Sequence, residues 1–183
     1  MNMGQKLELI NPANGEKFRE LPYHSWNDAE SLLTTAGNTQ KKWKNTEITE
    51  RILIINAAMD YFRENQKTIA EDITMQMGKP ISQSRNEVMG MIHRAEACCV
   101  LAEDALKDIA LPKLEGLQRF IKREPLGVIL DIAAWNYPLL IAVNVVVPAV
   151  LAGNAVAIKH SSLTPPCGKA FEDAFKFAGA PDS

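Results

Sequence analysis

The chain has 183 residues, of which 46% are hydrophobic and 23% are charged, and its formal net charge is −2. This balance is typical of one globular domain, or of one domain with an appendage, and it suffices for a sizeable core. The small net charge and the lack of a basic block exclude the usual nucleic-acid-binding proteins and proteins held by charge on anionic membranes.

No stretch of the sequence indicates a membrane or an oxidising compartment. The opening residues, MNMGQKLELI, contain neither a long apolar stretch nor a small-residue cleavage site, so we expect no signal peptide. The most apolar window, from Leu126 to Ile158, is interrupted by polar residues and prolines, which makes it a poor transmembrane segment. The cysteines lack metal-ligand spacing and are odd in number, so we expect a reduced, cytoplasmic protein without a metal site or a disulfide framework.

The N-terminal part is expected to form a hairpin followed by helices. Asn14-Gly15 lies between apolar stretches and favours a tight turn between two short strands. Residues 25–109 carry helical patterns. Ser25 or Asn27 is the candidate N-cap of the first helix, and a later helix is expected to end at Gly78, before a proline.

The remaining chain changes to strands that alternate with helices. Residues 117–127, LQRFIKREPLG, predict an edge-type strand, and residues 127–134, GVILDIAA, form a run typical of a strand buried on both faces. The next helix is expected to begin at Pro138, to end at Gly153 and to kink or break at Pro148.

A second strand and helix complete this region. Residues 154–160, NAVAIKH, predict a buried strand, and a helix is expected from Thr164-Pro165 to Gly179. The order predicts an α/β fold, namely the first two units of a doubly wound, Rossmann-like parallel sheet with right-handed crossovers. Ligands of such sheets bind at the carboxyl ends of the strands, where Trp135-Asn136 follows the first strand and residues 159–164 follow the second.

Asn136 is a polar residue in the middle of an apolar region. Its side-chain amide could donate to an oxygen that becomes negative during a reaction, beside a helix N-terminus. Alternatively, Asn136 caps that helix, with Pro138 in the first turn. Because capping asparagines are far commoner than catalytic ones, the spacing alone favours the cap.

The second polar cluster allows the same two kinds of interpretation. Lys159 could hydrogen-bond to the ribose or a phosphate of a nucleotide, or it could close a strand in solvent. Ser161, Ser162 and Thr164 could line the same pocket or serve as turn and capping residues. The sequence contains neither G-x-G-x-x-G nor a Walker-type loop, so a generic dinucleotide fingerprint is absent.

The cysteines do not indicate a nucleophile. Cys98-Cys99 lies in an apolar helical pattern, which favours packing in the core. Cys167 falls in the first turn of a helix, where a thiolate would be stabilised, but no adjacent base is visible. We therefore expect none of these thiols to act in catalysis.

Several segments together resemble one enzyme family. EPLGVILDIAAWNYPLL, PAVLAGNAVAIKHSSLTP and the later AGAP closely resemble the aldehyde dehydrogenase superfamily, in which the W-N-x-P and L-A-G-N-x-x-x-x-K elements are specific. MGKPISQSRNEV looks like the family's N-terminal helices, and a strand pair near residues 110–124 resembles its oligomerisation arm. The resemblance covers essentially the whole chain. It implies the N-terminal part of a cofactor-binding domain within a homo-oligomer.

The resemblance also implies roles for individual residues. Asn136 matches the asparagine whose amide stabilises a thiohemiacetal oxyanion, and Lys159 matches the lysine that contacts the adenosine ribose. Positions that line the cofactor groove near the nicotinamide correspond to Ile132, Ala133, Ala134 and Trp135. Family members oxidise an aldehyde through a cysteine thiohemiacetal with NAD+ or NADP+, so a small-molecule aldehyde is the implied partner.

The sequence departs from the family pattern in two ways. Ser162 and His160 stand where the family usually has Glu and Pro. A carboxylate there grips the ribose 2′-hydroxyl and repels a 2′-phosphate, so Ser162 predicts that NADP+ is at least tolerated. The sequence also lacks the glycine-rich loop, the general-base glutamate and the nucleophilic cysteine that the family places downstream. Because the thiolate is indispensable, we expect the 183-residue chain alone to be inactive.

Two other functions stay open. The chain could be a non-catalytic remnant that packs against a full-length relative, or it could use acyl-phosphate or acyl-CoA reductase chemistry. W-N-[FY]-P argues against the reductases, which tend to lack it. A sheet that stops after two units leaves an unpaired edge and an uncovered apolar face, so we expect the isolated chain to self-associate or to be poorly soluble.

Overall fold

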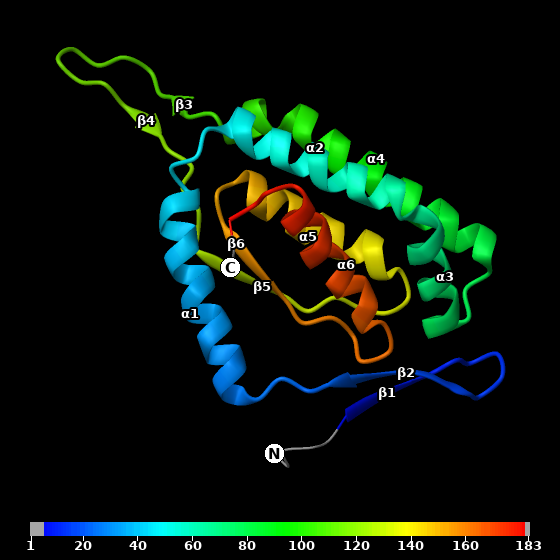
Figure 1. Cartoon of the computed structure of the whole chain (residues 1–183). Helices are drawn as coiled ribbons and strands as arrows, with labels where there is room; N and C mark the ends of the chain where they lie inside the picture. Colours follow the sequence, from blue (N-terminus) through cyan, green and yellow to red (C-terminus); the bar gives the residue numbers. More distant parts are fainter. Residues whose placement is uncertain (1–5, 182–183) are drawn as a thin grey trace.

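The computed structural model describes residues 6–181 (Figure 1). An antiparallel hairpin opens this range, formed by β1 (Lys6–Ile10) and β2 (Lys17–Pro22). Gly15 in the connecting turn has a φ of +75°, a left-handed conformation that glycine adopts without a steric penalty. The predicted hairpin is therefore confirmed. The first five residues, on which part of the signal-peptide prediction rests, lie outside the described range.

Four helices follow the hairpin: α1 (Trp26–Trp43), α2 (Ile48–Glu64), α3 (Gln66–Met77) and α4 (Ile81–Leu106). Ser25 caps α1, because its hydroxyl accepts from the Asp28 amide at 3.1 Å and the Asp28 carboxylate accepts from the Ser25 amide at 2.8 Å. Helix α3 ends at Gly78, whose φ is +75°. Both boundaries depend on local chemistry, which explains why the sequence located them.

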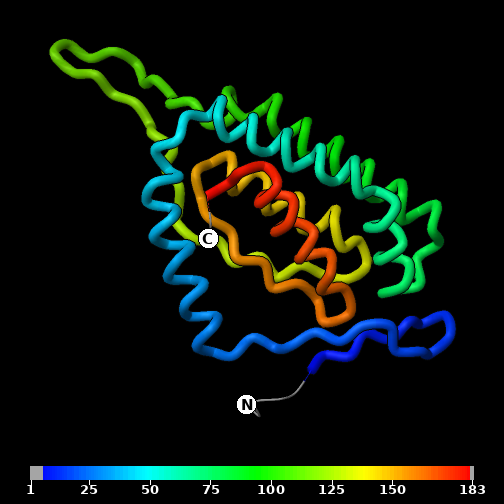
Figure 2. Tube along the Cα trace, in the orientation of Figure 1, coloured from blue at the N-terminus to red at the C-terminus, as the bar shows by residue number. Residues whose placement is uncertain are grey.

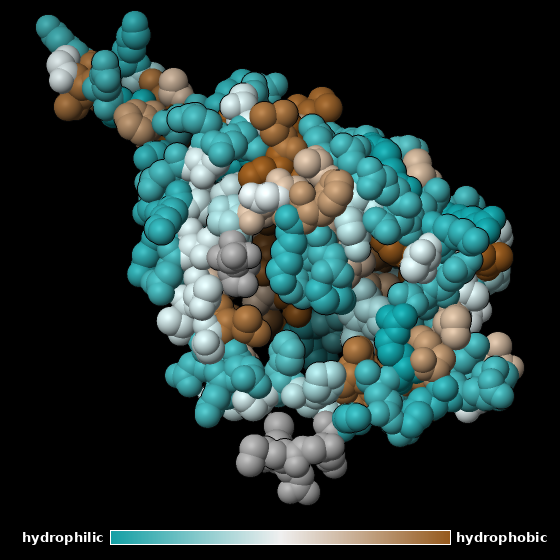
Figure 3. All heavy atoms as spheres, in the orientation of Figure 1, coloured by the Kyte–Doolittle hydropathy of each residue, from teal (hydrophilic) through white to brown (hydrophobic). Residues whose placement is uncertain are grey.

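A second antiparallel hairpin projects from the body of the molecule (Figures 1 and 2). It contains β3 (Ile109–Ala110) and β4 (Phe120–Ile121). The expected strand pair is therefore present, but each strand is only two residues long, so the longer edge-type strand is not formed. Both strands are exposed, and Figure 3 shows hydrophobic side chains among hydrophilic ones along this projection. Within residues 6–181, no other element covers these strands, and the alternating sequence does not produce a longer ladder.

The α/β region contains β5 (Val128–Asp131), α5 (Pro138–Leu151), β6 (Ala155–Ile158) and α6 (Pro165–Phe177). β5 and β6 are parallel neighbours, which confirms the predicted strand direction. Helix α5 runs through Pro148 without interruption, so of the kink or break predicted there, the break does not occur. Proline has no N–H to donate to the carbonyl four residues earlier in the helix. Because Pro148 is exposed, water can donate to that carbonyl instead.

The core lies around α5, which packs against α2, α4 and α6 (Figures 1 and 2). Helix α1 contacts the sheet formed by β5 and β6. Large, fully buried side chains fill the space between these helices: Phe62, Phe171, Ile55, Met59, Ile73, Met91, Ile92, Leu139, Val88, Val143 and Val147. Phe62 and Phe171 meet edge to face, with ring centroids 5.2 Å apart, and so join α2 to α6.

The expected burial of β5 on both faces is wrong, and so is the expected burial of β6. Leu130 in β5 is 60% exposed, and Ile132 just beyond it is 69% exposed, while β6 is only half-buried. In the described chain, β5 has one neighbouring strand, and the helices leave these two side chains uncovered. Burial of a strand depends on what packs against it, and an apolar run does not reveal whether that neighbour is present.

Candidate active site

The two polar clusters expected at the carboxyl ends of β5 and β6 lie side by side. The amide of Lys159 donates to the Asp131 carbonyl at 2.8 Å, and the amide of Ser161 donates to the Ala133 carbonyl at 2.9 Å. These bonds continue the pairing of the two parallel strands and hold the following loops together. The juxtaposition predicted from the strand order is therefore confirmed.

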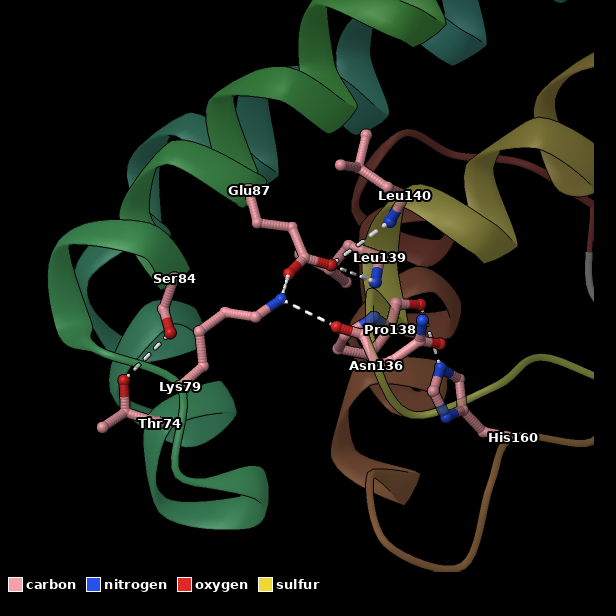
Figure 4. A network of polar contacts seen from close by, with 9 residues as sticks. All are labelled: Thr74, Lys79, Ser84, Glu87, Asn136, Pro138, Leu139, Leu140 and His160. Carbon is pink, nitrogen blue, oxygen red and sulfur yellow. Dashed lines mark hydrogen bonds and ion pairs between the residues drawn. The ribbon is translucent and has the colours of Figure 1, made fainter.

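Asn136 does not cap helix α5, so the capping interpretation is wrong. The N-cap position belongs to Tyr137, and no side chain at that position makes a capping hydrogen bond. Instead, the amides of Leu139 and Leu140 donate to one carboxylate oxygen of Glu87, on helix α4, at 3.0 and 3.4 Å (Figure 4). The Asn136 side chain is exposed, and within residues 6–181 its amide makes no hydrogen bond.

A buried ion pair supports this turn (Figure 4). The Lys79 ammonium donates to the Glu87 carboxylate and, at 3.0 Å, to the Asn136 carbonyl. It also lies 4.0 Å from the centre of the Tyr137 ring, a cation–π geometry. Lys79 and Glu87 are only 7% and 3% exposed, so both charges depend on each other and on the backbone for compensation.

No motif in the sequence pointed to Lys79 or Glu87. The available signal was a glutamate on the apolar face of a helix, one residue before the fully buried Val88. An unpaired carboxylate is rarely buried, so such a position indicates a cationic partner. The partner could not be identified, because the contact depends on how the α3–α4 connection folds back against α5.

His160 joins the second polar cluster to the same turn. Its Nε2 lies 3.1 Å from the Pro138 carbonyl, and its Nδ1 lies 3.1 Å from the Thr164 hydroxyl (Figure 4 shows the first contact). Burial lowers the pKa of His160, which favours the neutral ring. A neutral ring that carries its proton on Nε2 donates to Pro138 and accepts from Thr164. Thr164, which is fully buried, therefore supports the loop and does not line an open pocket.

Most of the other predicted site residues are exposed, and one is buried. Ile132, Ala134, Trp135, Lys159 and Ser162 are exposed, and they surround the carboxyl ends of β5 and β6. Ala133 is buried, so only its backbone is available there. Asp131, just before these residues, is also buried, and one of its carboxylate oxygens has no partner within residues 6–181. Burial raises the pKa of Asp131.

None of the three thiols is activated: Cys99 and Cys167 are buried, and Cys98 is partly buried. Burial raises the pKa of the Cys98 thiol, raises that of Cys99 to about 11, and raises that of Cys167 strongly despite its place in the first turn of α6. Such thiols are poor nucleophiles. In the described part of the chain, no three His, Cys, Asp or Glu side chains are grouped as a metal site would require, and no helix is long and apolar enough to span a membrane.

Comparison with known proteins decides the family. Residues 1–183 match the sequence model of the aldehyde dehydrogenase family. The chain belongs to this family. Similar curated members include the succinate semialdehyde dehydrogenase [NAD(P)+] of Escherichia coli K12, which is 35% identical over 174 residues. The 3,6-anhydro-α-L-galactose dehydrogenase of Streptomyces coelicolor is 30% identical over 182 residues.

Solved structures of the family share this fold. An NADP-dependent glyceraldehyde-3-phosphate dehydrogenase from Bacillus halodurans, complexed with NADP, is 28% identical and superimposes with a TM-score of 0.91, with 98% of this chain and 39% of that chain covered. An NAD-dependent benzaldehyde dehydrogenase from Corynebacterium glutamicum is 27% identical, also with a TM-score of 0.91, with 99% of this chain and 40% of that chain covered.

The chain is much shorter than its family relatives. The matches cover 94% of this chain and 37% of the E. coli enzyme, and 96% of this chain and 36% of the Streptomyces enzyme. The fold and the family are therefore established for the segment that contains Asn136, Lys159 and Ser162. The remaining length of these relatives has no counterpart in the 183 residues.

Proposed function

We propose that the chain forms the N-terminal part of the cofactor-binding domain of an NAD(P)+-dependent aldehyde dehydrogenase, completed by further strands of a longer polypeptide. The observation that carries this proposal is the free Asn136 amide, which stands beside a helix N-terminus that another residue already caps. The proposal is supported by the names of the curated relatives and by their greater length.

The proposed chemistry assigns one step to this chain. A cysteine thiolate adds to the aldehyde carbon, and the carbonyl oxygen becomes the oxyanion of a thiohemiacetal. The Asn136 N–H donates to that oxygen and stabilises the developing charge more than the neutral carbonyl. Bound NAD(P)+ would accept the hydride from the thiohemiacetal carbon, which would leave a thioester. Water would then hydrolyse the thioester to the carboxylic acid and release the cysteine thiol. Because burial raises the pKa of all three thiols of this chain, we assign the thiolate to another part of the enzyme.

The exposed residues fit a dinucleotide. Lys159 and Ser162 present an ammonium group and a hydroxyl at the end of β6, suited to the hydroxyls of the adenosine ribose. Ile132, Ala134 and Trp135 at the end of β5 would line the nicotinamide side. Because Ser162 carries no charge to repel a 2′-phosphate, we expect NADP+ to be accepted. Titration of activity with each cofactor tests this expectation, and strict use of NAD+ with no detectable NADP+ reduction contradicts it.

The intact mass of the native polypeptide in its source cells tests the main proposal, with an antibody raised against this segment. A species more than twice the 20.3 kDa of this chain, which reduces NAD(P)+ with an aldehyde, is the expected result. A native species near 20.3 kDa without activity contradicts the proposal. We also expect no activity from the pure chain, and NAD(P)H production that a cysteine reagent abolishes would overturn that expectation.

A non-catalytic partner of a larger relative is the second candidate function. It is favoured by the exposed Leu130 and Ile132 side chains and by the apolar β3–β4 hairpin, which we propose as an oligomerisation arm in either case. Co-purification of a 20.3 kDa species with a full-length aldehyde dehydrogenase would support this candidate. A monomeric 20.3 kDa species that binds no such enzyme would contradict it.

A further inference from the structure

We infer that Lys79 and Glu87 are positioning residues for Asn136, and that they hold the turn from which its amide reaches the reacting oxygen. The inference rests on the proposed function, since it needs Asn136 to act in catalysis. Both residues come from the helical region, 57 and 49 positions before Asn136 in the sequence. They reach the turn only through the fold.

The ion pair holds the turn on both sides of Tyr137. On one side, Lys79 donates to the Asn136 carbonyl at 3.0 Å. On the other side, Glu87 accepts from the Leu139 amide at 3.0 Å, in the first turn of α5. The backbone that carries the Asn136 amide is therefore fixed at two points, while the side chain stays free to meet a ligand. A displacement of about 1 Å in a catalytic group can lower a rate about 100-fold.

The two charges have to act together. The positive end of a helix dipole favours a carboxylate, and Glu87 occupies that end of α5. A lone buried carboxylate would also oppose an oxyanion forming nearby, since water screens buried charges only weakly. Lys79 removes this conflict, because its ammonium group neutralises Glu87 and contacts the Asn136 carbonyl. The helix is capped while the oxyanion meets no net negative charge.

Stability alone does not account for this arrangement. A buried ion pair is often no more stabilising than apolar residues of similar volume. The apolar core around α5 shows that such packing was available: Val88, next to Glu87 in the chain, and Leu139, whose amide donates to Glu87, are fully buried. The geometry of Lys79 and Glu87 is instead explained by the two groups that they hold in place, the Asn136 backbone and the N-terminus of α5.

The test uses the native polypeptide that carries this chain. Lys79→Met and the double variant Lys79→Met/Glu87→Gln are made in the wild-type background and in the Asn136→Ala background. The double variant removes both charges but keeps an amide oxygen that can accept from Leu139, so it guards against simple unfolding. Lys169→Met is the matched control, since it removes a lysine from an exposed ion pair with Asp173. The measured quantities are kcat, the KM for NAD(P)+ and the thermal midpoint.

In the wild-type background, we expect Lys79→Met to lower kcat about 100-fold and the double variant to lower it about 10-fold. The KM for the cofactor should change less than about twofold, because Lys159 and Ser162 are untouched. In the Asn136→Ala background, neither pair variant should lower kcat further, since a positioning residue has nothing left to position. Lys169→Met should leave kcat unchanged.

Equal losses of kcat in both backgrounds would show that the pair acts through stability, and would overturn the inference. So would an unchanged kcat in the double variant when Asn136→Ala lowers it, and in that case the proposed function stands while this inference alone fails. If Asn136→Ala itself leaves kcat unchanged, or if the native polypeptide is inactive, the proposed function fails and the inference fails with it.

Discussion

Both ends of helix α5 are covered by other helices, yet the groups that satisfy their unpaired backbone atoms differ in kind. At the C-terminal end, the Trp43 indole donates to the Val150 carbonyl at 3.0 Å, and the Arg51 guanidinium donates to the Leu151 carbonyl at 2.7 Å. These donors come from α1 and α2. The positive guanidinium also matches the negative end of the helix dipole.

At the N-terminal end, the capping group is a carboxylate whose charge is paired. Glu87 accepts from the first turn of α5, and Lys79 both neutralises it and reaches the Asn136 carbonyl. In the described chain, the exposed Asn136 amide is left without a partner at this end. The C-terminal contacts are therefore explained by the stability of a buried helix, whereas the N-terminal contacts leave a donor free at the mouth of the proposed site.

Replacement of Asn136, near the N-terminal end of α5, should have a large effect on kcat and a small effect on stability. We expect Asn136→Ala to lower kcat of the native polypeptide about 100-fold or more, because it removes a donor to the oxyanion. Its free energy of unfolding should change by less than about 0.5 kcal/mol, because the side chain is exposed and makes no hydrogen bond within residues 6–181. Kinetics and urea unfolding measure the two quantities. Asn27→Ala, at an exposed position whose side chain makes no hydrogen bond within residues 6–181, is the control. A large loss of stability for Asn136→Ala would indicate a structural role instead.

Replacement of Arg51 should show the opposite behaviour. Arg51→Ala removes the donors to the Leu151 carbonyl and, at 3.0 Å, to the Lys44 carbonyl. We expect the free energy of unfolding to fall by about 2–3 kcal/mol, while kcat per folded molecule stays the same. Arg51→Lys keeps the charge but cannot span both carbonyls, so it should fall between wild type and alanine. A fall in kcat that exceeds the loss of folded protein would contradict the proposal that the contacts at the C-terminal end of α5 serve stability alone.

Trp43→Phe tests a smaller contribution at the same end. The substitution keeps an aromatic ring in the core but removes the indole N–H that donates to the Val150 carbonyl. We expect a loss of at most about 1 kcal/mol in the free energy of unfolding, because the partly buried Val150 carbonyl loses the indole and keeps the Gly153 amide, at 3.0 Å, as a donor. Thermal unfolding at fixed pH measures the loss. No loss would mean that water replaces the indole at this carbonyl.

The features that the sequence predicted correctly are those set by neighbouring residues. The Ser25 cap, the stop at Gly78 and the start of α5 at Pro138 each depend on the local backbone. Two predictions failed because they depend on distant segments. Leu130 is exposed because nothing in the described chain covers it, and Asn136 does not cap α5 because a carboxylate from another helix already does. A sequence pattern can indicate that a helix end needs a cap, but it cannot identify a donor or acceptor about fifty residues away.

The smallest expected effect concerns Asp131, which lies between the core and the proposed cofactor groove. Burial raises the pKa of its carboxyl in the folded state above the ordinary value of 3.8. At pH values between 3.8 and the raised pKa, the folded state binds more protons than the unfolded state. The contribution of Asp131 to stability is therefore more favourable in acid and is lost as the pH rises. Asp131→Asn should therefore have the higher thermal midpoint at pH 7, by no more than about 2–4 °C, and the advantage should disappear as the pH approaches 4. A difference in midpoint that stays constant between pH 4 and pH 7 would show that the carboxyl does not titrate differently in the two states.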